Sequence, residues 1–517
     1  MAISLPRLKW VVIDGLSFEC LKTYLCPQTM PVLRQMMTSN CLTALEPLYP
    51  NCQTPPSLFS IWSGRQSEEH GILGYDTPDT DVFSTFHNGF TAWPSHIDMV
   101  WDKYARAGYR VRLHHVPFVD EAKITPQMVA RSDVYSQRLW SSQTVPLTEV
   151  LNIAPLSVSI AFSQINEQRT KLLIESPNGK VCHLVSNNEV VDLPLPDGES
   201  LPHLSVLISN NGQEWVCSVL GKNAYRASPT VDTVKNRHQL TFCHEALTQS
   251  YRNGLLGDKL SQSGGGEAEE ALLLSLEKVH RCFLEELALG YSQDDADLYV
   301  GYYPVFDLAL HEVLGLQALV SSTSQVTKIM TQLLLWVEEV VHTLTTSLDE
   351  GEVLVMNSDH GMQPIQNTCY LNNLMAEKGW LRFKEGGEID WSNTVAAYHP
   401  AENGTLSILA DQFDTEAIIT DILDWFEALG FSGAKVVRLD DHQGVLSKEN
   451  RYFLIPPDGL RVKANQSVDA LCSSAKSGDH CAHSNHPWLK GVLMTSGLPT
   501  VERPRHLHQI LNFIEEG

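Results

Sequence analysis

The sequence predicts an α/β fold with a mainly parallel central sheet, helices on both faces of that sheet, and an antiparallel β-rich insertion. Three observations support this prediction. Short apolar runs alternate with amphipathic stretches in both terminal parts of the chain, a pattern typical of parallel strands joined by helices. Residues 151–222 instead hold short strand-like runs joined by hairpin turns. No apolar run reaches the ~20 residues that span a bilayer, so we expect no membrane partner.

The first part of the chain alternates between expected strands and helices. Residues 9–13 form a short apolar run that ends at Asp14-Gly15, and a helical stretch then ends near Met36. Residues 55–62 read as a helix because prolines stand at its start and an apolar face follows. The other expected strands of this part are 43–48 and 109–114.

The middle of the chain carries the β-rich insertion. Two of its connections, Pro177-Asn178-Gly179 and Asn210-Asn211-Gly212, have the residue types of hairpin turns. Residues 261–266 (SQSGGG) read as a flexible linker. After it, the pattern predicts helices at 267–289, 324–348 and 415–428 and strands at 298–302, 352–356 and 491–495. We expect domain bounds at 1–150, 151–265 and 266–517, with the first and last segments forming one α/β core.

Composition limits the classes of partner and compartment. The 517 residues include 37 Lys and Arg against 61 Asp and Glu, a formal charge of −24. This balance argues against a nucleic acid polymer as partner, because such binding needs basic side chains to replace phosphate counterions. The apolar run from Trp10 is interrupted at Asp14, too early for a signal-peptide core. The 11 cysteines include no CxxC pair, so we expect free thiols in a cytoplasmic protein.

Unusual polar residues follow the expected strands. In open α/β sheets, ligands bind outside the carboxyl ends of the strands, and two residues four apart on a helix share one face. Three carboxylates, three imidazoles and a hydroxyl suffice for two adjacent metal ions of the zinc type. The candidates are Asp14, Thr54, Asp307 with His311, Asp359 with His360, and one of His480, His483 and His486.

Each of these motifs also has an ordinary structural interpretation. Asp14-Gly15 could be a simple turn, Thr54 could cap the following helix, and the late histidines could lie on the surface. Their joint occurrence, each at the end of an expected strand, favours the metal site. His70, His114 and His115 are interpreted as structural, because the metal complement is complete without them.

Several motifs occur together in one order along the chain. They are VVIDG at 11–15, Thr54-Pro55-Pro56 with Ser63-Gly64, HGI at 70–72, D-x-x-x-H at 307–311, SDHGM at 358–362, YFLIPPDGLRVK at 452–463, and His486-Pro487 before GVLMTSG. Through them the chain resembles the alkaline phosphatase superfamily, and within it the type I phosphodiesterase/nucleotide pyrophosphatase branch. The resemblance covers about residues 1–120 and 295–515.

The resemblance implies an alkaline-phosphatase-like fold with two divalent metal ions, usually Zn²⁺, with Mn²⁺ or Fe as alternatives. One ion would be held by Asp307, His311 and His486. The other would be held by Asp14, Asp359, His360 and the oxygen of Thr54. We choose His486 because Pro487 and the GVLMTSG strand follow it; His483 is its rival and His480 ranks third.

The resemblance also implies a mechanism. Thr54 would be the nucleophile, because coordination to a divalent ion favours its alkoxide, and a covalent phospho-threonine would then be hydrolysed. Residue 55 is proline and cannot offer a backbone donor beside it. Ser57 is expected to bind substrate, since its hydroxyl stands where the branch usually has an asparagine and has a shorter reach.

We therefore expect a two-metal hydrolase of phosphoric esters of a small molecule, either phosphodiesters or pyrophosphates. A phosphonate hydrolase or a phosphomonoesterase would use the same residues, and a non-catalytic binding protein is the less favoured alternative. The β-rich insertion would either cap the active site or form a homodimer contact.

Overall fold

The structure of the chain is a computed structural model. It describes residues 5–39, 41–78, 85–133, 135, 138–196, 203–224, 241–292, 296–319, 323–409, 414–438, 451–467, 469–481, 486–498 and 503–516. Contacts between backbone positions divide the chain into two compact units. The first unit comprises Met1–Val12, Tyr24–Gln35 and Tyr104–Val355, and the second comprises Ile13–Thr23, Met36–Lys103 and Met356–Gly517.

A seven-stranded sheet has the strand order β2-β29-β19-β1-β18-β5-β6. β5 pairs in parallel with both β18 and β6, whereas β2 pairs antiparallel with β29. Every residue of β1, β18 and β19 is buried, as expected for strands covered on both faces. The strands are β1 Leu8–Ile13, β2 Leu42–Leu45, β5 Val111–His115, β6 Met128–Asp133, β18 Leu298–Tyr303, β19 Val353–Asn357 and β29 Gly491–Ser496. The predicted α/β class is confirmed.

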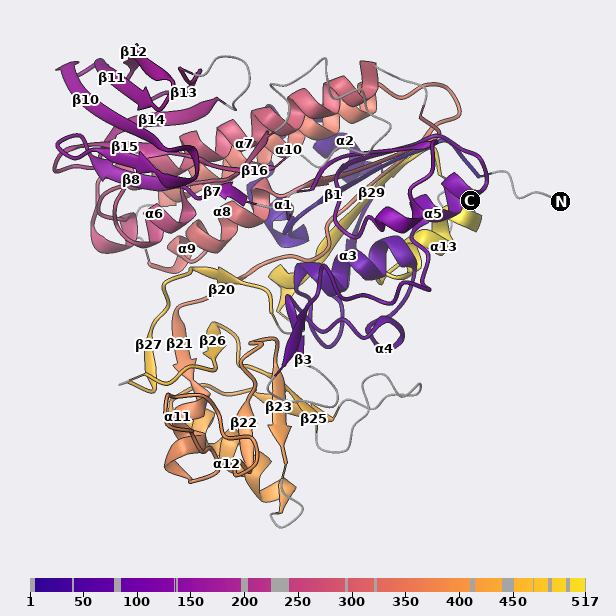
Figure 1. Cartoon of the computed structure of the whole chain (residues 1–517). Coiled ribbons are helices and arrows are strands. Elements are labelled where there is room, and N and C mark those ends of the chain that lie inside the picture. Colours follow the sequence, from indigo (N-terminus) through magenta and orange to yellow (C-terminus); the bar gives the residue numbers. More distant parts are fainter. Residues whose placement is uncertain are drawn as a thin grey trace. The chain divides into compact units, whose positions relative to one another are not determined.

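Two long helices dominate the helical part of the first unit (Figure 1). They are α7 (Glu267–Ser292) and α10 (Thr323–Thr346), and both contact the short helix α8 (Val305–Val313). α7 also packs against β5. Acidic side chains occupy its first turn, where they interact favourably with the helix dipole. The shorter helices of this part are α6 Thr248–Arg252, α9 Leu316–Leu319 and the 3₁₀ turns η1 Glu121–Lys123, η2 Ala154–Leu156 and η5 Leu260–Gln262.

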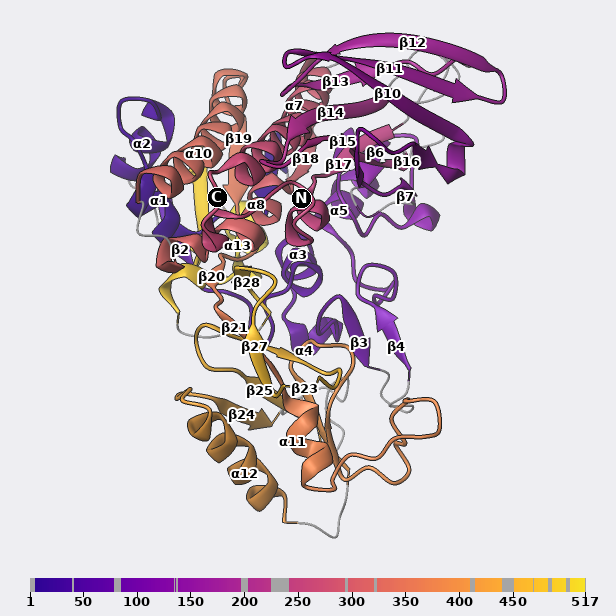
Figure 2. The same ribbon diagram turned by 90° about the vertical axis from the view of Figure 1, so that its left-hand side faces the viewer.

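The β-rich insertion consists of two four-stranded antiparallel sheets, ordered β12-β11-β10-β9 and β13-β14-β15-β8 (Figure 2). Their strands are β8 Gln143–Pro146, β9 Leu151–Ile153, β10 Val158–Asn166, β11 Arg169–Ser176, β12 Gly179–Ser186, β13 Val190–Leu193, β14 Leu204–Asn210 and β15 Trp215–Val219. Exposed and buried residues alternate along β11, and buried residues of both sheets share one apolar core. The predicted antiparallel insertion is confirmed, although its sheets already begin at β8.

The predicted hairpin turns of the insertion are present. β11 and β12 pair up to Ser176 opposite Gly179, which leaves a two-residue turn. In the second turn, Gly212 has a φ of 89°, a left-handed conformation that favours glycine. A third small sheet of this unit, ordered β17-β16-β7, contains β7 Arg138–Trp140, β16 Gly221–Ala224 and β17 Thr241–Glu245.

The second unit contains the helix that starts at Thr54. This helix, α3 (Thr54–Ser63), is buried at all ten positions and packs against α13 (Gln509–Glu516). Shorter elements near it are α4 Ser67–His70, β3 Asp76–Pro78 and β4 Phe86–Asn88. Three other short helices each contain a residue at which the chain passes from one unit to the other: α1 Phe18–Tyr24, α2 Pro31–Thr38 and α5 Val100–Arg106.

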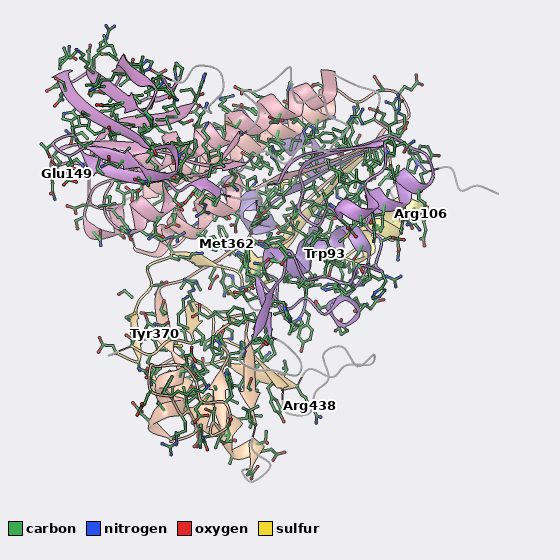
Figure 3. The ribbon with its side chains drawn as sticks, viewed as in Figure 1. Trp93, Arg106, Glu149, Met362, Tyr370 and Arg438 are labelled. Atoms are coloured by element: carbon green, nitrogen blue, oxygen red, sulfur yellow. The ribbon has the colours of Figure 1, made fainter. Side chains whose placement is uncertain are left out.

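A separate apolar core lies within residues 369–471 of the second unit. It is enclosed by two small sheets, ordered β26-β21-β27 and β22-β23-β25-β24, and by two helices. Figure 3 shows its side chains and labels Tyr370 at the end of β21. The elements of the second unit between residues 363 and 489 are β20 Gln363–Pro364, β21 Asn367–Tyr370, α11 Leu371–Glu377, β22 Ala396–Tyr398, β23 Thr405–Ile408, α12 Thr415–Ala428, β24 Lys435–Arg438, β25 Arg451–Ile455, β26 Leu460–Lys463, β27 Leu471–Ser473, β28 Gly478–Asp479 and η6 Pro487–Leu489.

Most elements expected from the sequence are present within a few residues of their predicted bounds. The stretch expected to end near Met36 is divided into α1 and α2, and the expected linker 261–266 begins inside η5. The ten cysteines whose state the structure describes are free thiols. Among the described helices, none combines the length and apolar character needed to cross a membrane. The predicted domain bounds stay a prediction.

Candidate metal centre

The segment Ser358–Gly361 leaves the buried strand β19 and is fixed by backbone hydrogen bonds. Ser358 N donates to Val492 O at 3.0 Å, and Gly361 N donates to Leu489 O at 2.8 Å. A Cβ atom at Gly361 would lie 2.1 Å from the carbonyl oxygen of Trp488, so only glycine fits at this position. The following residue, Met362, is buried and is labelled in Figure 3.

Backbone groups orient the carboxylate of Asp359. Its Oδ1 accepts hydrogen bonds from Gly15 N at 3.3 Å and from His360 N at 3.1 Å. Its Oδ2 lies 3.2 Å from His360 Nε2, and Asp14 Oδ1 lies 3.3 Å from the same nitrogen. Two carboxylates therefore meet one imidazole nitrogen.

The ring of His360 is held so that Nε2 points toward these carboxylates. Its Nδ1 lies 2.9 Å from the carbonyl oxygen of Gly361, which can only accept, so Nδ1 carries the proton and donates. In the neutral imidazole the lone pair then lies on Nε2. This is the arrangement of a metal-binding histidine whose second nitrogen is fixed by a carbonyl.

Thr54 completes this group from the first residue of α3. Its Oγ1 lies 3.4 Å from His360 Nε2 and accepts a hydrogen bond from the hydroxyl of Tyr75 at 3.1 Å. Thr54, Asp359 and His360 are fully buried, and Asp14 is 2% exposed. The structure thus brings together Asp14, Thr54, Asp359 and His360, the four residues predicted to hold one metal ion.

The donor set fits a divalent cation. Two carboxylates taken out of water so close together are costly without a compensating positive charge. Oxygen and imidazole nitrogen donors are ligands of Zn²⁺ and of related ions. Asp14 and His360 each belong to a buried group of carboxylates and imidazoles able to hold a metal ion. Metal binding is therefore the chemistry that this arrangement supports.

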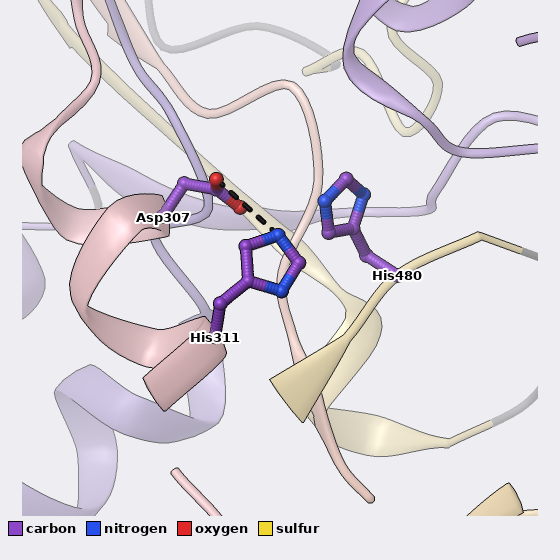
Figure 4. A group of neighbouring side chains, drawn as sticks. All are labelled: Asp307, His311 and His480. Atoms are coloured by element: carbon purple, nitrogen blue, oxygen red, sulfur yellow. Dashed lines mark ion pairs between the residues drawn. The ribbon is translucent and has the colours of Figure 1, made fainter. Parts of the chain in front are cut away.

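Asp307 and His311 lie in the first unit, one turn apart on α8. His311 Nε2 lies 3.5 Å from Asp307 Oδ2, and both residues are buried. Figure 4 shows the two side chains on one face of the helix, with the ion pair dashed. The predicted helical spacing is confirmed, and the pair offers one carboxylate and one imidazole as ligands.

Among the three late histidines, His480 lies against His360. The two rings are stacked with centroids 3.7 Å apart and planes 13° apart. His480 is 3% exposed, and its Nδ1 lies 3.3 Å from the carbonyl oxygen of Cys52. The Cys52 thiol in turn donates to the His480 carbonyl at 2.8 Å. As in His360, a carbonyl engages Nδ1 and leaves Nε2 to act as a ligand.

His486 has a different environment. It caps η6, where its Nδ1 accepts a hydrogen bond from Trp488 N at 3.3 Å. It is half-buried, and this burial lowers the pKa of its imidazole, although the negative charge of Asp458 acts in the opposite direction. The assignment of His486 as a ligand stays a prediction. Its rival His483 lies outside the described residues.

Two further residues of α3 and its surroundings were singled out from the sequence. Ser57 is fully buried, and its hydroxyl has no hydrogen-bond partner within the part of the chain that the structure describes. His70 is structural in this geometry: its Nδ1 accepts from Ile72 N at 3.1 Å and its Nε2 faces Ser60 Oγ at 3.0 Å. Burial lowers the pKa of His70 to about 3, so its ring is neutral.

The sequence did not single out Tyr75, and it ranked His480 third among the late histidines. Tyr75 is 21 residues from Thr54 along the chain, and no pattern within its own loop marks it. His480 directly follows the two-residue strand β28, as Asp14 and Asp359 follow β1 and β19 closely, but β28 is too short to be predicted from the sequence.

Comparison with known proteins places the chain in a family. The sequence model of type I phosphodiesterase / nucleotide pyrophosphatase matches residues 10–178 and 204–425, more than half of the chain. The chain belongs to the type I phosphodiesterase/nucleotide pyrophosphatase family. The match extends into the β-rich insertion, which no motif covers. Together with the buried Asp and His groups, family membership identifies the chain as a metal-dependent hydrolase of the phosphodiesterase type.

Solved structures of this fold are similar along the whole chain. Phosphonoacetate hydrolase from Sinorhizobium meliloti 1021, in complex with phosphonoformate, matches with a TM-score of 0.50 at 11% identity, covering 100% of this chain and 98% of that chain. Murine ectonucleotide pyrophosphatase / phosphodiesterase 5, in an inactive form with AMP, has a TM-score of 0.47 at 11% identity, with coverage of 99% and 95%. The search of curated proteins found no match. The first of these matches confirms the alkaline-phosphatase-like fold of this family member.

Proposed function

We propose that this family member hydrolyses phosphoric esters of a small molecule, either phosphodiesters or pyrophosphates, through a covalent phospho-threonine at Thr54. The observation that carries the proposal is the convergence of Asp14 Oδ1, Asp359 Oδ2 and Thr54 Oγ1 within 3.2 to 3.4 Å of His360 Nε2. A hydroxyl buried among metal-binding groups is suited to act as a nucleophile.

The proposed reaction proceeds in two displacements at phosphorus. In the first, Oγ1 of Thr54 bonds to phosphorus, and the bond from phosphorus to the leaving oxygen breaks. The leaving oxygen keeps the electron pair and takes up, through solvent, the proton that the Thr54 hydroxyl loses. In the second, water attacks phosphorus and the bond to Thr54 Oγ1 breaks. The hydroxyl of the water stays on phosphorus, and its other proton restores the Thr54 hydroxyl. A divalent ion held by Asp14, Asp359 and His360 would lower the pKa of the Thr54 hydroxyl.

The residues of the chain hold the nucleophile in place during these steps. The backbone donors of Gly15 and His360 fix one oxygen of Asp359 and leave its other oxygen as a ligand. Thr54 is fixed at the first position of a fully buried helix. Such pre-organisation reduces the rearrangement needed when charge develops on the reacting oxygens.

We further propose a second divalent ion, with Asp307 and His311 among its ligands and one imidazole from the C-terminal segment. The support is family membership and the ligand-type pair that α8 presents. Zn²⁺ is the first choice for both positions because oxygen and nitrogen ligands suit it, with Mn²⁺ or Fe as alternatives. For that imidazole we favour His480 over the sequence-based choice of His486, because His480 contacts His360.

The test combines metal analysis with turnover. Purified protein is loaded with Zn²⁺, its metal content is measured, and hydrolysis of bis-p-nitrophenyl phosphate is compared for the wild type, Thr54→Ala and Thr54→Ser. We expect at least one metal ion per chain, no turnover by Thr54→Ala, and residual turnover by Thr54→Ser. Equal rates for wild type and Thr54→Ala would refute the nucleophile, and a metal-free wild type would refute the metal centre.

A substrate panel separates the alternatives that share these residues. The loaded enzyme is given diesters, pyrophosphates, monoesters and phosphonates under the same conditions. We expect kcat/KM to be highest for a diester or a pyrophosphate. A maximum for a phosphonate or a monoester would keep Thr54 as nucleophile and overturn the proposed substrate class.

A further inference from the structure

The hydroxyl of Tyr75 touches the oxygen that we propose as the nucleophile. It donates a hydrogen bond to Thr54 Oγ1 at 3.1 Å. His360 Nε2, one of the proposed metal-binding groups, lies 3.4 Å from the same oxygen. Thr54 Oγ1 therefore contacts both a hydrogen-bond donor, Tyr75, and a metal-binding nitrogen.

The loop that carries Tyr75 is fixed to the start of α3. Tyr75 N donates to Gln53 Oε1 at 2.9 Å, and the Tyr75 carbonyl accepts from Gly89 N at 2.7 Å. The ring packs edge-to-face on Phe90, with centroids 5.8 Å apart. Contacts on the backbone and on the ring thus aim the hydroxyl, so its position does not depend on a flexible side chain alone.

Two glycines allow this loop to approach so closely. A Cβ atom at Gly74 would lie 2.3 Å from Gln53 Oε1, and one at Gly89 would lie 2.1 Å from the carbonyl oxygen of Gly74. A larger residue at position 74 would displace the Gln53 oxygen that accepts from Tyr75 N, and one at position 89 would displace the backbone of Gly74. The close approach of Tyr75 to Thr54 is therefore built into the local sequence.

The start of α3 lacks the donors that a helix N-terminus usually offers to an anion. Residues 55 and 56 are prolines without an N–H group. The next amide, of Ser57, already donates to Gln53 O at 3.2 Å. Backbone N–H groups commonly stabilise phosphoryl oxygens at helix N-termini, and the two prolines remove two such donors from the start of α3.

We propose that Tyr75 is a catalytic residue whose hydroxyl donates to Thr54 Oγ1 when that oxygen carries charge. The inference rests on the proposed function and names a donor for it. Negative charge lies on Oγ1 before it attacks phosphorus, and it returns when the bond from phosphorus to Oγ1 breaks during hydrolysis of the phospho-threonine. A hydrogen bond to a charged oxygen is about twice as strong as one to a neutral oxygen. Tyr75 thereby accelerates both displacements and transfers no proton of its own.

Tyr75→Phe tests this role because it keeps the ring and its contact with Phe90 and removes only the donor. For Zn²⁺-loaded enzyme with bis-p-nitrophenyl phosphate we expect kcat to fall by ~10²–10³-fold, the range for loss of one donor to a reacting oxygen. KM and metal content should stay within threefold of wild type.

The matched control is Tyr104→Phe, which removes a phenol that donates to a backbone carbonyl, that of Pro6, at 2.8 Å. We expect its kcat to match wild type. Should Tyr75→Phe fold poorly by circular dichroism, Gln53→Ala is the second variant, because it frees the Tyr75 backbone but keeps the phenol; kcat should fall at least tenfold.

The outcomes separate this inference from the proposed function. If Thr54→Ala is inactive while Tyr75→Phe keeps wild-type kcat, the role of Tyr75 is refuted and the nucleophile stands. If Tyr75→Phe loses kcat only in proportion to a loss of bound metal, Tyr75 supports the metal centre and its role as a donor to the nucleophile is refuted as well. If the loaded wild type hydrolyses none of the panel, the proposed function and the role of Tyr75 fail together.

Discussion

Replacing the late histidines one at a time decides which of them is a metal ligand. His480 is 3% exposed, stacks on His360 at 3.7 Å and has its Nδ1 engaged by the Cys52 carbonyl. His480→Ala should therefore remove a ligand atom from a buried site. Changes to residues that merely orient ligands typically weaken metal binding by ~10–100-fold, so loss of a ligand should cost at least ~100-fold, or ~2.7 kcal/mol.

His486→Ala should behave differently. His486 Nδ1 accepts one hydrogen bond, from Trp488 N, at the start of η6. Loss of a helix cap costs ~0.5–2 kcal/mol of stability, which lowers Tm by a few degrees at most. The Zn²⁺ affinity should stay within threefold of wild type.

The assay is competition between each variant and a chromophoric Zn²⁺ chelator, with Tm measured on the same samples. His483→Ala is included because His483 was the rival prediction from the sequence. The reasoning would be refuted if His486→Ala or His483→Ala lost zinc at least 100-fold while His480→Ala kept wild-type affinity. Loss of zinc only by His480→Ala would overturn the sequence-based choice of His486.

Three further predictions concern the surroundings of the centre. Gly361→Ala should unfold at clearly lower urea concentration, because its Cβ would lie 2.1 Å from a backbone carbonyl; an unchanged midpoint would show that the segment can move. Ser57→Ala should leave Tm equal or higher, since it removes a buried hydroxyl without a partner among the described residues, yet lower kcat/KM if Ser57 binds substrate; unchanged kcat/KM would end that role. Burial lowers the pKa of His70 to about 3 in the folded protein, below the ~6.5 of an unfolded chain. The unfolded chain therefore binds a proton more readily, so the stability from this group is fully present above pH 6.5 and is lost as the pH falls toward 3. Unfolding free energy should then fall by ~2–3 kcal/mol between pH 6.5 and 4.5 from this group, and His70→Gln should remove that part of the pH dependence in urea titrations.

The elements of the fold were predictable because their signals are local. The apolar run before Asp14 and the run before Asp359 are short, continuous and ended by polar residues, and both are strands buried at every position. The helical spacing of Asp307 and His311 needed only a four-residue period. Hairpin chemistry likewise located the turns of the insertion, where Ser176 pairs with Gly179.

The core within residues 369–471 was not anticipated as a separate unit of packing. Its strands are three to five residues long, too short for a clear alternation of polar and apolar residues. Four of them pair in the order β22-β23-β25-β24, which joins segments far apart along the chain. Such pairing is decided by tertiary packing and leaves little trace in local propensity.

The contact of His480 with His360 could not be predicted from the sequence for a related reason. The sequence favours His486 because Pro487 and the GVLMTSG strand follow it with family-like spacing. The position of His480 is instead set by β28, which pairs antiparallel with β20, so that Gln363 lies opposite Asp479. β20 begins directly after Met362, at the end of the segment that carries His360. A two-residue ladder between segments more than a hundred residues apart therefore brings the two imidazoles together, and no spacing within either segment encodes it. The position of Tyr75 also depends on a contact between separate segments, since the Gln53 side chain accepts a hydrogen bond from its backbone beside Thr54. Candidate ligands that follow continuous buried strands can be predicted from sequence, whereas the groups that contact those candidates through short non-local pairings require the structure.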